Sequence, residues 1–174
     1  MINKQMYFKY FIFMCNINGN KKIYMKNVTN KLIQDFGLIK DCEKHVSQCK
    51  CICCKFDDNY IVLYPGEFET TKLKKGHIKI IDDNYFGGKK AICLRPCNED
   101  DFKPLDCKSY PYFPKINEKG ELKIIKGSKC PLNEEELISH KKIFSEIWDY
   151  LIKNKEIFEW LKKIELIGYE ETEL

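Results

Sequence analysis

The most regular hydrophobic pattern lies in the C-terminal part of the chain. After residue 134, apolar residues recur at helical spacing and would form one face of a helix: Leu137, Phe144, Ile147, Trp148 and Leu151. A second helix is expected over residues 154–167, with its apolar side formed by Ile157, Trp160, Leu161 and Ile164. Both tryptophans are more typical of core packing than of a binding site. The pattern therefore predicts a C-terminal helical pair.

A capping pattern predicts where the first of these helices begins. Asn133 stands three residues before Glu136, which is the spacing of a capping box. Leu132 and Leu137 fit the hydrophobic staple that accompanies such a cap. The acidic side chains after Asn133 also suit the positive end of a helix dipole. The helix is therefore expected to start next to Asn133.

Before the helical pair, short apolar runs between turn-forming residues predict short strands. These runs cover residues 60–64, 78–81, 89–94, 112–116 and 122–125. Residues 117–120, Asn-Glu-Lys-Gly, predict a hairpin between the last two strands. Residues 82–88 are expected to form a turn, residues 67–74 a helical turn and residues 26–40 a helix. The expected fold class is α+β, with a small irregular β region and a C-terminal helical pair.

The 174 residues suit one domain, which we expect over residues 26–174. Residues 1–25 are interpreted as an N-terminal extension, with Met1 or Met25 as the native start. The apolar run near Phe11 is too short to span a bilayer, and no small-residue cleavage site follows it. These features favour a cytoplasmic protein over a secreted one.

The net charge and the distribution of charged residues indicate which classes of binding partner to expect. The chain has 30 basic and 26 acidic residues, a net charge of +4, and its lysines are scattered among acids. Nucleic-acid binding and membrane binding are therefore not expected. A protein or small-molecule partner is left open. The sequence shows no nucleophile–base pair and no phosphate-binding loop, so it predicts no catalytic residue.

The cysteines carry the strongest chemical signal. Nine of the ten fall between Cys42 and Cys130. Thiolates at this density usually bind a soft metal or an iron–sulfur cluster. Disulfides fit less well, because the adjacent residues Cys53 and Cys54 cannot bond to each other without strain. The predicted metal ligands are Cys49, Cys51, Cys53, Cys54, Cys93, Cys107 and Cys130.

The expected cofactor is zinc or iron, with an iron–sulfur cluster as one option. Four ligands complete a zinc site or a four-iron cluster, and the larger set allows two metals. Cys53, Cys54, Cys107 and Cys130 are expected to lie together in space, with Cys93 or one of Cys49 and Cys51 nearby. Cys15 and Cys42 fit small buried hydrophobic residues, and the role of Cys97 is open.

Two other residue types bear on the site. The histidines His45, His77 and His140 are more typical of surface residues than of ligands. Glu67 follows Pro65-Gly66, where the chain turns sharply. It could accept a hydrogen bond beside the metal site or carry a proton there, or it could be the acid at the start of a helix.

Four sequence blocks resemble the YkgJ-type cysteine-cluster family, which is described as chelating zinc or iron. They are Cys53-Cys54 with the cysteines before it, Ile61-Val-Leu-Tyr-Pro-Gly-Glu67, Cys107-Lys-Ser-Tyr-Pro-Tyr-Phe-Pro114 and Cys130-Pro-Leu132. The family usually has Cys-x-x-Cys-x-x-Cys-Cys, whereas this chain has Cys49-x-Cys51-x-Cys53-Cys54. Lys108 also replaces the arginine that usually follows the third-block cysteine. The resemblance implies ligand roles for Cys53, Cys54, Cys93, Cys107 and Cys130.

Three functions follow from this interpretation. The first is a protein with a zinc or iron–sulfur centre, with an oxidoreductase or a modifying enzyme of unknown substrate among the options. The second is a non-enzymatic module in which a structural metal supports a surface for a protein partner. The third is a metal-handling protein that carries zinc or iron reversibly.

Overall fold

The computed structural model of the chain describes residues 59–70, 76–95 and 101–172. The predicted extension over residues 1–25 and the predicted helix over residues 26–40 lie outside this part. In chain order the described elements are β1 (Ile61–Leu63), α6 (Glu67–Thr70), β2 (Ile78–Tyr85), β3 (Gly88–Cys93), α7 (Leu105–Ser109), β4 (Tyr112–Ile116), β5 (Leu122–Gly127), α8 (Ile138–Leu151), α9 (Lys155–Lys163) and β6 (Tyr169–Glu171).

The strands form two antiparallel sheets of three strands each. The first sheet has the order β1–β3–β2, and the second has the order β4–β5–β6. The α+β class is therefore confirmed, although the strands form two sheets rather than one small region. The predicted hairpin is also confirmed, because β4 pairs with β5 and Gly120 adopts a φ of 81° in the turn between them.

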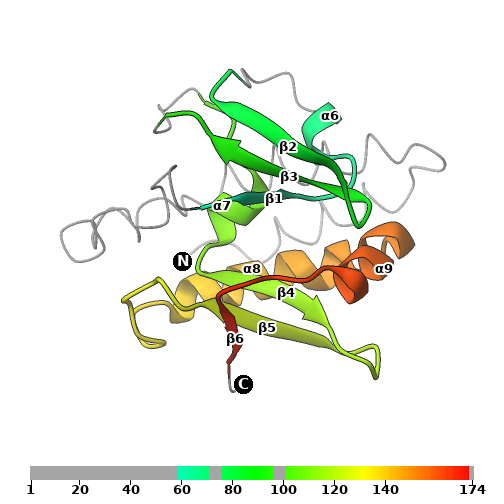
Figure 1. Cartoon of the computed structure of the whole chain (residues 1–174). Helices are drawn as coiled ribbons and strands as arrows, with labels where there is room; N and C mark the ends of the chain where they lie inside the picture. Colours follow the sequence, from blue (N-terminus) through cyan, green and yellow to red (C-terminus); the bar gives the residue numbers. More distant parts are fainter. Residues whose placement is uncertain (1–58, 71–75, 96–100, 173–174) are drawn as a thin grey trace, which may run out of the picture.

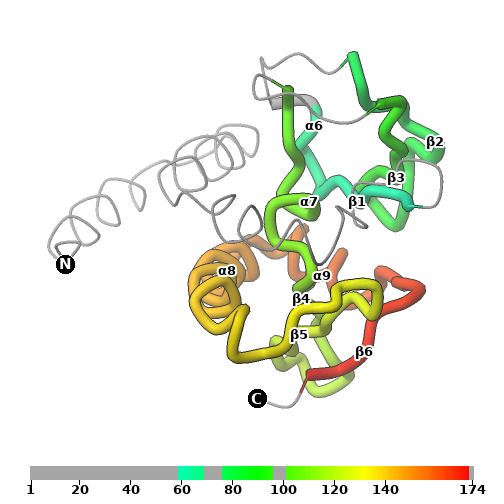
Figure 2. The backbone as a smooth tube through the Cα atoms, turned by 90° about the vertical axis from the view of Figure 1, so that its left-hand side faces the viewer, coloured from blue at the N-terminus to red at the C-terminus, as the bar shows by residue number. Residues whose placement is uncertain are grey.

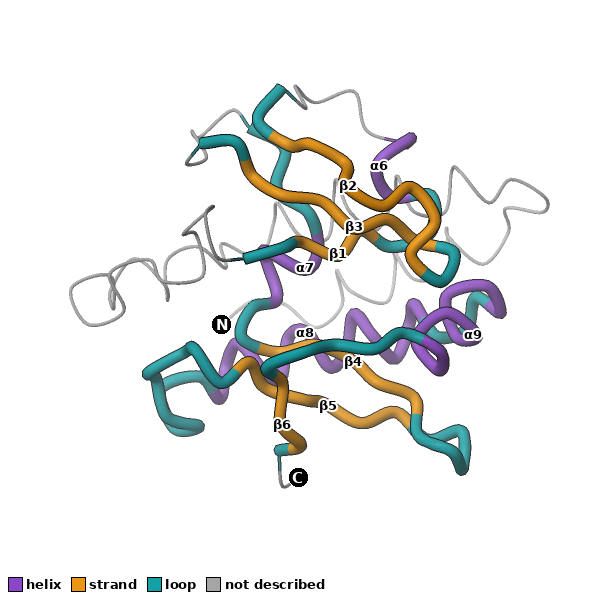
Figure 3. The backbone as a smooth tube through the Cα atoms, in the orientation of Figure 1, coloured by secondary structure: helices purple, strands orange, loops and turns teal. Residues whose placement is uncertain are grey.

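Figure 1 shows the two sheets at opposite ends of the described structure, with α8 and α9 near the second sheet and α6 beside the first. Helices α8 and α9 both contact β4, and the short helix α7 contacts β1 as well as β4. The perpendicular view places α7 at the passage between the two sheets (Figure 2). Figure 3 shows how short α7 is beside α8 and α9. The position of α7 makes it the structural link between the two halves.

Strand β1 separates two hydrophobic cores. Val62 and Tyr64 belong to a larger core that includes both tryptophans and the inner faces of α8 and α9. Ile61 and Leu63 belong to a smaller core with Ile78, Ala91 and Phe102. This alternation follows from strand geometry, because successive side chains point to opposite faces. A strand of three residues therefore anchors the two cores to each other.

The apolar faces of the helical pair are confirmed, and their bounds differ from the prediction. All the residues assigned to these faces are buried, including Trp148 and Trp160. Asn133 and Glu136 exchange the expected capping bonds, at 2.8 and 2.9 Å, but α8 begins only at Ile138. The capping box therefore closes a turn that precedes the helix. Helix α9 ends at Lys163, after which the chain turns back to form β6.

Asn154 is expected to stabilise α9 as its N-cap. Its side-chain oxygen accepts hydrogen bonds from the backbone N–H groups of Glu156 and Ile157. Asn154→Ala removes this acceptor, so the free energy of unfolding should fall by about 1 kcal/mol. Urea unfolding measures this, with the exposed Asn84→Ala in β2 as the matched control. Equal effects of the two substitutions would contradict the assignment.

Candidate cysteine site

The structure describes three of the seven predicted ligands. Cys93 and Cys130 are partly buried, and Cys107 is exposed. The other four, Cys49, Cys51, Cys53 and Cys54, lie outside the described residues, as do Cys15, Cys42, Cys97 and His45. Within the described ranges, no three His, Cys, Asp or Glu side chains lie close enough together to hold a metal ion. The predicted cluster therefore stays a prediction.

Cys107 lies in the middle of α7 and is exposed, whereas most of this helix is buried. Leu105, Asp106 and Ser109 are buried on its other sides. Leu105 belongs to the larger core, and the carboxylate of Asp106 contacts β1. The thiol of Cys107 is thus presented on a helix whose other side chains fix it to the protein.

Two buried carboxylates join α7 to the β1–α6 segment. Asp106 Oδ2 accepts a hydrogen bond from Val62 N at 2.8 Å. In return, Glu67 Oε1 accepts one from Leu105 N at 2.6 Å. The second oxygen of Glu67 accepts a bond from Tyr64 N at 3.0 Å. Each segment thus supplies a carboxylate to a backbone N–H of the other.

The structure places Glu67 at the start of α6, as one of the two sequence interpretations proposed. Its bond to Tyr64 N spans the turn formed by Pro65 and Gly66, which precedes the helix and has Gly66 at a φ of 77°. The bond to Leu105 N, however, joins residues 38 positions apart. Glu67 is therefore both the acid at a helix start and a long-range link to the segment that carries Cys107.

The far end of α7 is held by a histidine from α8. The ring atom His140 Nε2 lies 3.0 Å from the backbone oxygen of Ser109. The ring packs between Phe144 and Tyr112, with centroid distances of 4.8 and 6.1 Å. His140 and His77 are both buried, so the expectation that they lie at the surface is wrong. A polar group lies beside each ring: the backbone oxygen of Ser109 for His140, and the Asp101 carboxylate, 3.5 Å from Nδ1, for His77.

Burial shifts the pKa values of the groups around α7. It raises the pKa of the Glu67 carboxyl to about 7, against the lowering effect of hydrogen bonds from Leu105 and Tyr64. It also raises the pKa of Asp106 to about 7. The pKa of Lys108 is lowered by burial, an effect that the nearby Glu67 charge opposes. The junction therefore holds two acids that titrate near neutral pH.

Cys130 lies in the turn that follows β5, and this turn packs against the end of α7. Cys130 N donates to Gly127 O at 3.2 Å, and Gly127 N donates to Pro111 O at 2.7 Å. A Cβ atom on Gly127 would lie 2.8 Å from the ring of Tyr110, so only glycine fits this contact. Cys107 precedes Pro111 by four residues, and Cys130 follows Gly127 by three. Both cysteines thus flank the same end of the second sheet.

The start of β1 lies at this same end. The Lys129 ammonium donates a hydrogen bond to Asn59 Oδ1 at 2.7 Å. Lys129 adjoins Cys130, and Asn59 is the residue at which the described chain begins, five positions after Cys54. The contact therefore ties the Cys130 turn to the point where the chain arrives from the Cys49–Cys54 segment.

Cys93 lies in the first sheet, away from the Cys130 turn. It ends β3 opposite Ile78 and packs against the smaller core, whereas Cys130 packs against the larger one. Beside this end of β3, Arg95 forms two hydrogen bonds to Asp101, at 2.6 and 3.0 Å. The same carboxylate lies 3.5 Å from His77 Nδ1. The structure thus assigns Cys93 and Cys130 to different cores, on opposite faces of β1.

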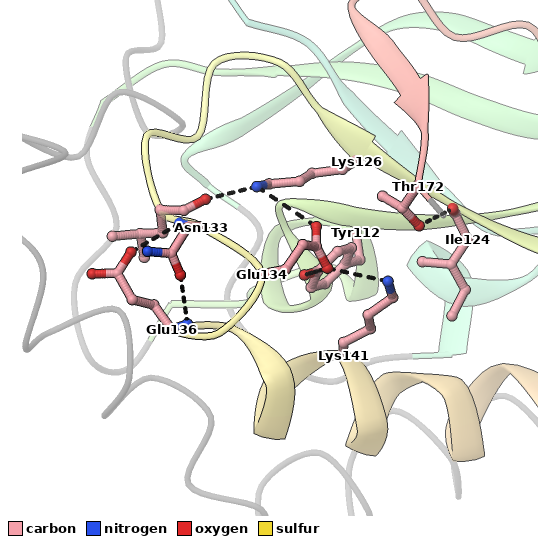
Figure 4. Close-up of polar contacts among 9 residues, drawn as sticks. Tyr112, Ile124, Lys126, Asn133, Glu134, Glu136, Lys141 and Thr172 are labelled. Carbon is pink, nitrogen blue, oxygen red and sulfur yellow. Dashed lines mark hydrogen bonds and ion pairs between the residues drawn. The ribbon is translucent and has the colours of Figure 1, made fainter. Parts of the chain in front are cut away.

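A shallow cavity of about 400 Å³ lies beside Cys130. Lys126, Ser128, Glu134, Glu170 and Thr172 also line it. Figure 4 shows the polar contacts at its edge, where Glu134 accepts a bond from the Tyr112 hydroxyl at 2.8 Å and contacts Lys141 at 3.1 Å. Burial raises the pKa of Tyr112, and Glu134 and Cys130 add to the effect. Cys130 therefore lies in a polar, charged setting.

A scan against protein-family models found no match, and searches of curated proteins and of solved structures found none. The resemblance to the YkgJ-type family thus rests on the four sequence blocks alone. Three of these blocks fall in described residues, and Glu67, the last residue of one block, accepts a hydrogen bond from Leu105 N, two residues before another block begins. Within the described residues, no helix is long and apolar enough to cross a membrane.

Sequence reasoning missed three residues of this region. Asp106 lies beside a cysteine in an apparent turn, and no short-range pattern indicates that its carboxylate bonds to β1. His140 is one polar residue on an otherwise amphipathic helix. Asn59 ends the polar run Asp57-Asp58-Asn59, which is typical of a loop. A signal was available only for His140, because it lies four residues before Phe144 and thus on the buried face.

Proposed function

We propose that this chain is a cytoplasmic metal-binding protein that holds zinc or an iron–sulfur centre through cysteine thiolates. Cys107 and Cys130 would supply two ligands, and Cys53 and Cys54 the others, with Cys49 or Cys51 in reserve. The resemblance to the YkgJ-type family also implies ligand roles for Cys53, Cys54, Cys107 and Cys130, together with Cys93. Whether the centre serves a reaction stays open, and no catalytic residue is proposed.

The observation that carries the proposal is that the Cys107 helix and the Cys130 turn are both bonded to the chain around β1, the strand that follows the Cys49–Cys54 segment in the sequence. The Lys129–Asn59 contact places the Cys130 turn against the entry to β1. The Asp106–Val62 bond places α7, and with it Cys107, against the same strand. The Cys49–Cys54 segment precedes that strand directly. Metal ligands from distant sequence positions need such a convergence, because four thiolates must approach one ion.

Cys93 is not proposed as a ligand of the site that contains Cys130. Since it packs on the smaller core, it would serve a second metal or act as a small buried side chain. The size of the cysteine set allows two metals, as the sequence suggests. Thus Cys93 is kept as a candidate ligand, but not of the site that contains Cys130.

The exposure of Cys107 favours the metal-handling function as a second candidate. A closed structural zinc site surrounds its ion with four protein ligands and is usually shielded from solvent. Cys107, in contrast, presents its side chain at the surface, where an incoming chelator or partner protein could reach the metal. Reversible transfer of zinc or iron to a partner would use this accessibility.

Metal content of the purified protein tests the proposal. Protein made anaerobically should carry at least one equivalent of zinc or iron, by elemental analysis, and visible absorption would distinguish an iron–sulfur cluster from zinc. Cys107→Ser and Cys130→Ser should each lower the metal content steeply, because one lost thiolate leaves the coordination incomplete. Cys15→Ser is the matched control and should retain the metal. Full metal content in both site variants would refute the site, and disulfide-bonded, metal-free wild type would refute the function.

A further inference from the structure

Helix α7 is held at both ends by buried polar side chains from other elements. Glu67, 1% exposed, accepts the N–H of its first residue, Leu105. His140, 2% exposed, contacts the backbone oxygen of its last residue, Ser109. Cys107 lies midway between these two contacts. The helix that carries the exposed thiol is thus hydrogen-bonded to α6 at its first residue and to α8 at its last.

A helix of this length does not hold its own position. Five residues form little more than one turn, and isolated helices that short are unstable in water. Only tertiary contacts therefore fix where Cys107 lies. Apolar packing through Leu105 buries the helix, but packing is non-directional and allows small rotations. The hydrogen bonds to Glu67 and His140 are directional, so together with the Asp106–Val62 bond they define both the position and the rotation of the helix.

Burial of these polar groups is costly, which indicates that the bonds themselves matter. Replacing buried polar or charged groups with well-packed apolar side chains often leaves stability equal or higher. Burial also raises the pKa of Glu67, which reflects the cost of holding its charge there. A requirement for defined geometry at α7 explains this arrangement, whereas a requirement for stability alone does not.

We propose that Glu67 and His140 are positioning residues that set the location of the Cys107 thiol for metal binding. Neither residue is proposed as a ligand, since each bonds to the α7 backbone and acts through it. The inference rests on the proposed function, because it names what orients one ligand of that site. Partners that orient metal ligands typically contribute 10- to 100-fold, roughly, to metal affinity.

Zinc affinity of full-length Glu67→Gln tests the proposal. Glutamine has the same size, but its NH₂ group must face the N–H of either Leu105 or Tyr64. One of the two hydrogen bonds that Glu67 accepts is therefore lost. The zinc dissociation constant, measured by competition with a chromophoric chelator, should rise about 10-fold. Ile157→Val in α9 is the control, because it loosens the larger core at a distance from α7. A smaller or equal effect of Glu67→Gln at matched stability would overturn the proposal.

Hydrogen exchange provides a readout that does not need metal. The amides of Lys108 and Tyr110 donate to Pro104 and Asp106 within α7. Glu67→Gln should lower their protection about 10-fold relative to the Phe158 amide in α9, and unchanged relative protection would overturn the positioning role. Hydrogen exchange tests whether Glu67 fixes α7 even if wild-type protein binds no zinc, an outcome that would refute the proposed function and the role of Glu67 in metal binding with it. His140→Gln provides the same test from the other end of α7 if Glu67→Gln folds poorly.

Discussion

Trp160→Ala is expected to lower the free energy of unfolding by about 3–5 kcal/mol, the range for removing a large buried aromatic side chain. Trp160 is 2% exposed and lies on α9, where it contacts residues of both sheets. Its ring packs on Tyr64 and Phe113 at centroid distances of 4.7 and 6.2 Å. Its indole N–H also donates to Tyr85 O, on the last residue of β2, at 3.1 Å.

The size of this effect follows from the position of Trp160 between the sheets. Alanine leaves a cavity in the larger core. It also removes the hydrogen bond between α9 and β2, and with it a contact between the helical pair and the first sheet. Urea unfolding followed by circular dichroism measures the loss. Phe158→Ala, at a half-buried position on the same helix, is the control and should cost clearly less. A loss for Trp160→Ala no larger than that of the control would contradict this account of how the sheets are joined.

Stability is expected to fall as the pH rises from about 5 to about 8. The pKa of Glu67 is about 7 in the folded protein, against an ordinary value of 4.5. Between these values the folded state binds a proton that the unfolded state has released, so raising the pH favours unfolding. At about 1.4 kcal/mol for each pH unit, Glu67 accounts for on the order of 2–3 kcal/mol. Asp106, whose pKa is also about 7, acts in the same direction.

Glu67→Gln should remove its share of this pH dependence. Urea midpoints at pH 5, 6, 7 and 8, at constant ionic strength and with a reductant, give the slope for each variant. Glu118→Gln, in the exposed hairpin turn, is the control and should keep the wild-type slope. Identical slopes for wild type and Glu67→Gln would show that Glu67 does not titrate in this window.

The elements that could be predicted from sequence are those with a hydrophobic repeat over several turns or with a recognisable turn between two strands. The apolar faces of α8 and α9 repeat over several turns, and the β4–β5 hairpin has its own turn residues, so local sequence determines both. Helix α7 and strand β6 escaped prediction because five and three residues are too few for a period to show. Tertiary contacts decide such elements, and here those contacts come from Glu67, His140 and β5.

In the candidate site, too, some features could be predicted from the sequence and others depend on tertiary contacts. The residue types of a thiolate metal site are visible in the sequence, and the Cys107 and Cys130 segments do come to one end of a sheet. That Cys93 packs on the other core could not be seen, because it depends on which face of the first sheet packs against the smaller core. The buried partners of α7 were equally hidden, since Glu67 and Leu105 are 38 residues apart.

The two carboxylates at β1 also bear on how one edge of the first sheet is covered. Among the described strands, β1 pairs only with β3, so its other side is a sheet edge. The two amides that point outward from this edge, Val62 N and Tyr64 N, are already bonded to Asp106 and Glu67. An edge with open amides is a template on which a strand of another molecule can add, and repeated addition leads to aggregates. Asp106 and Glu67 therefore occupy the two amides that such an added strand would need, while they hold α7 in place.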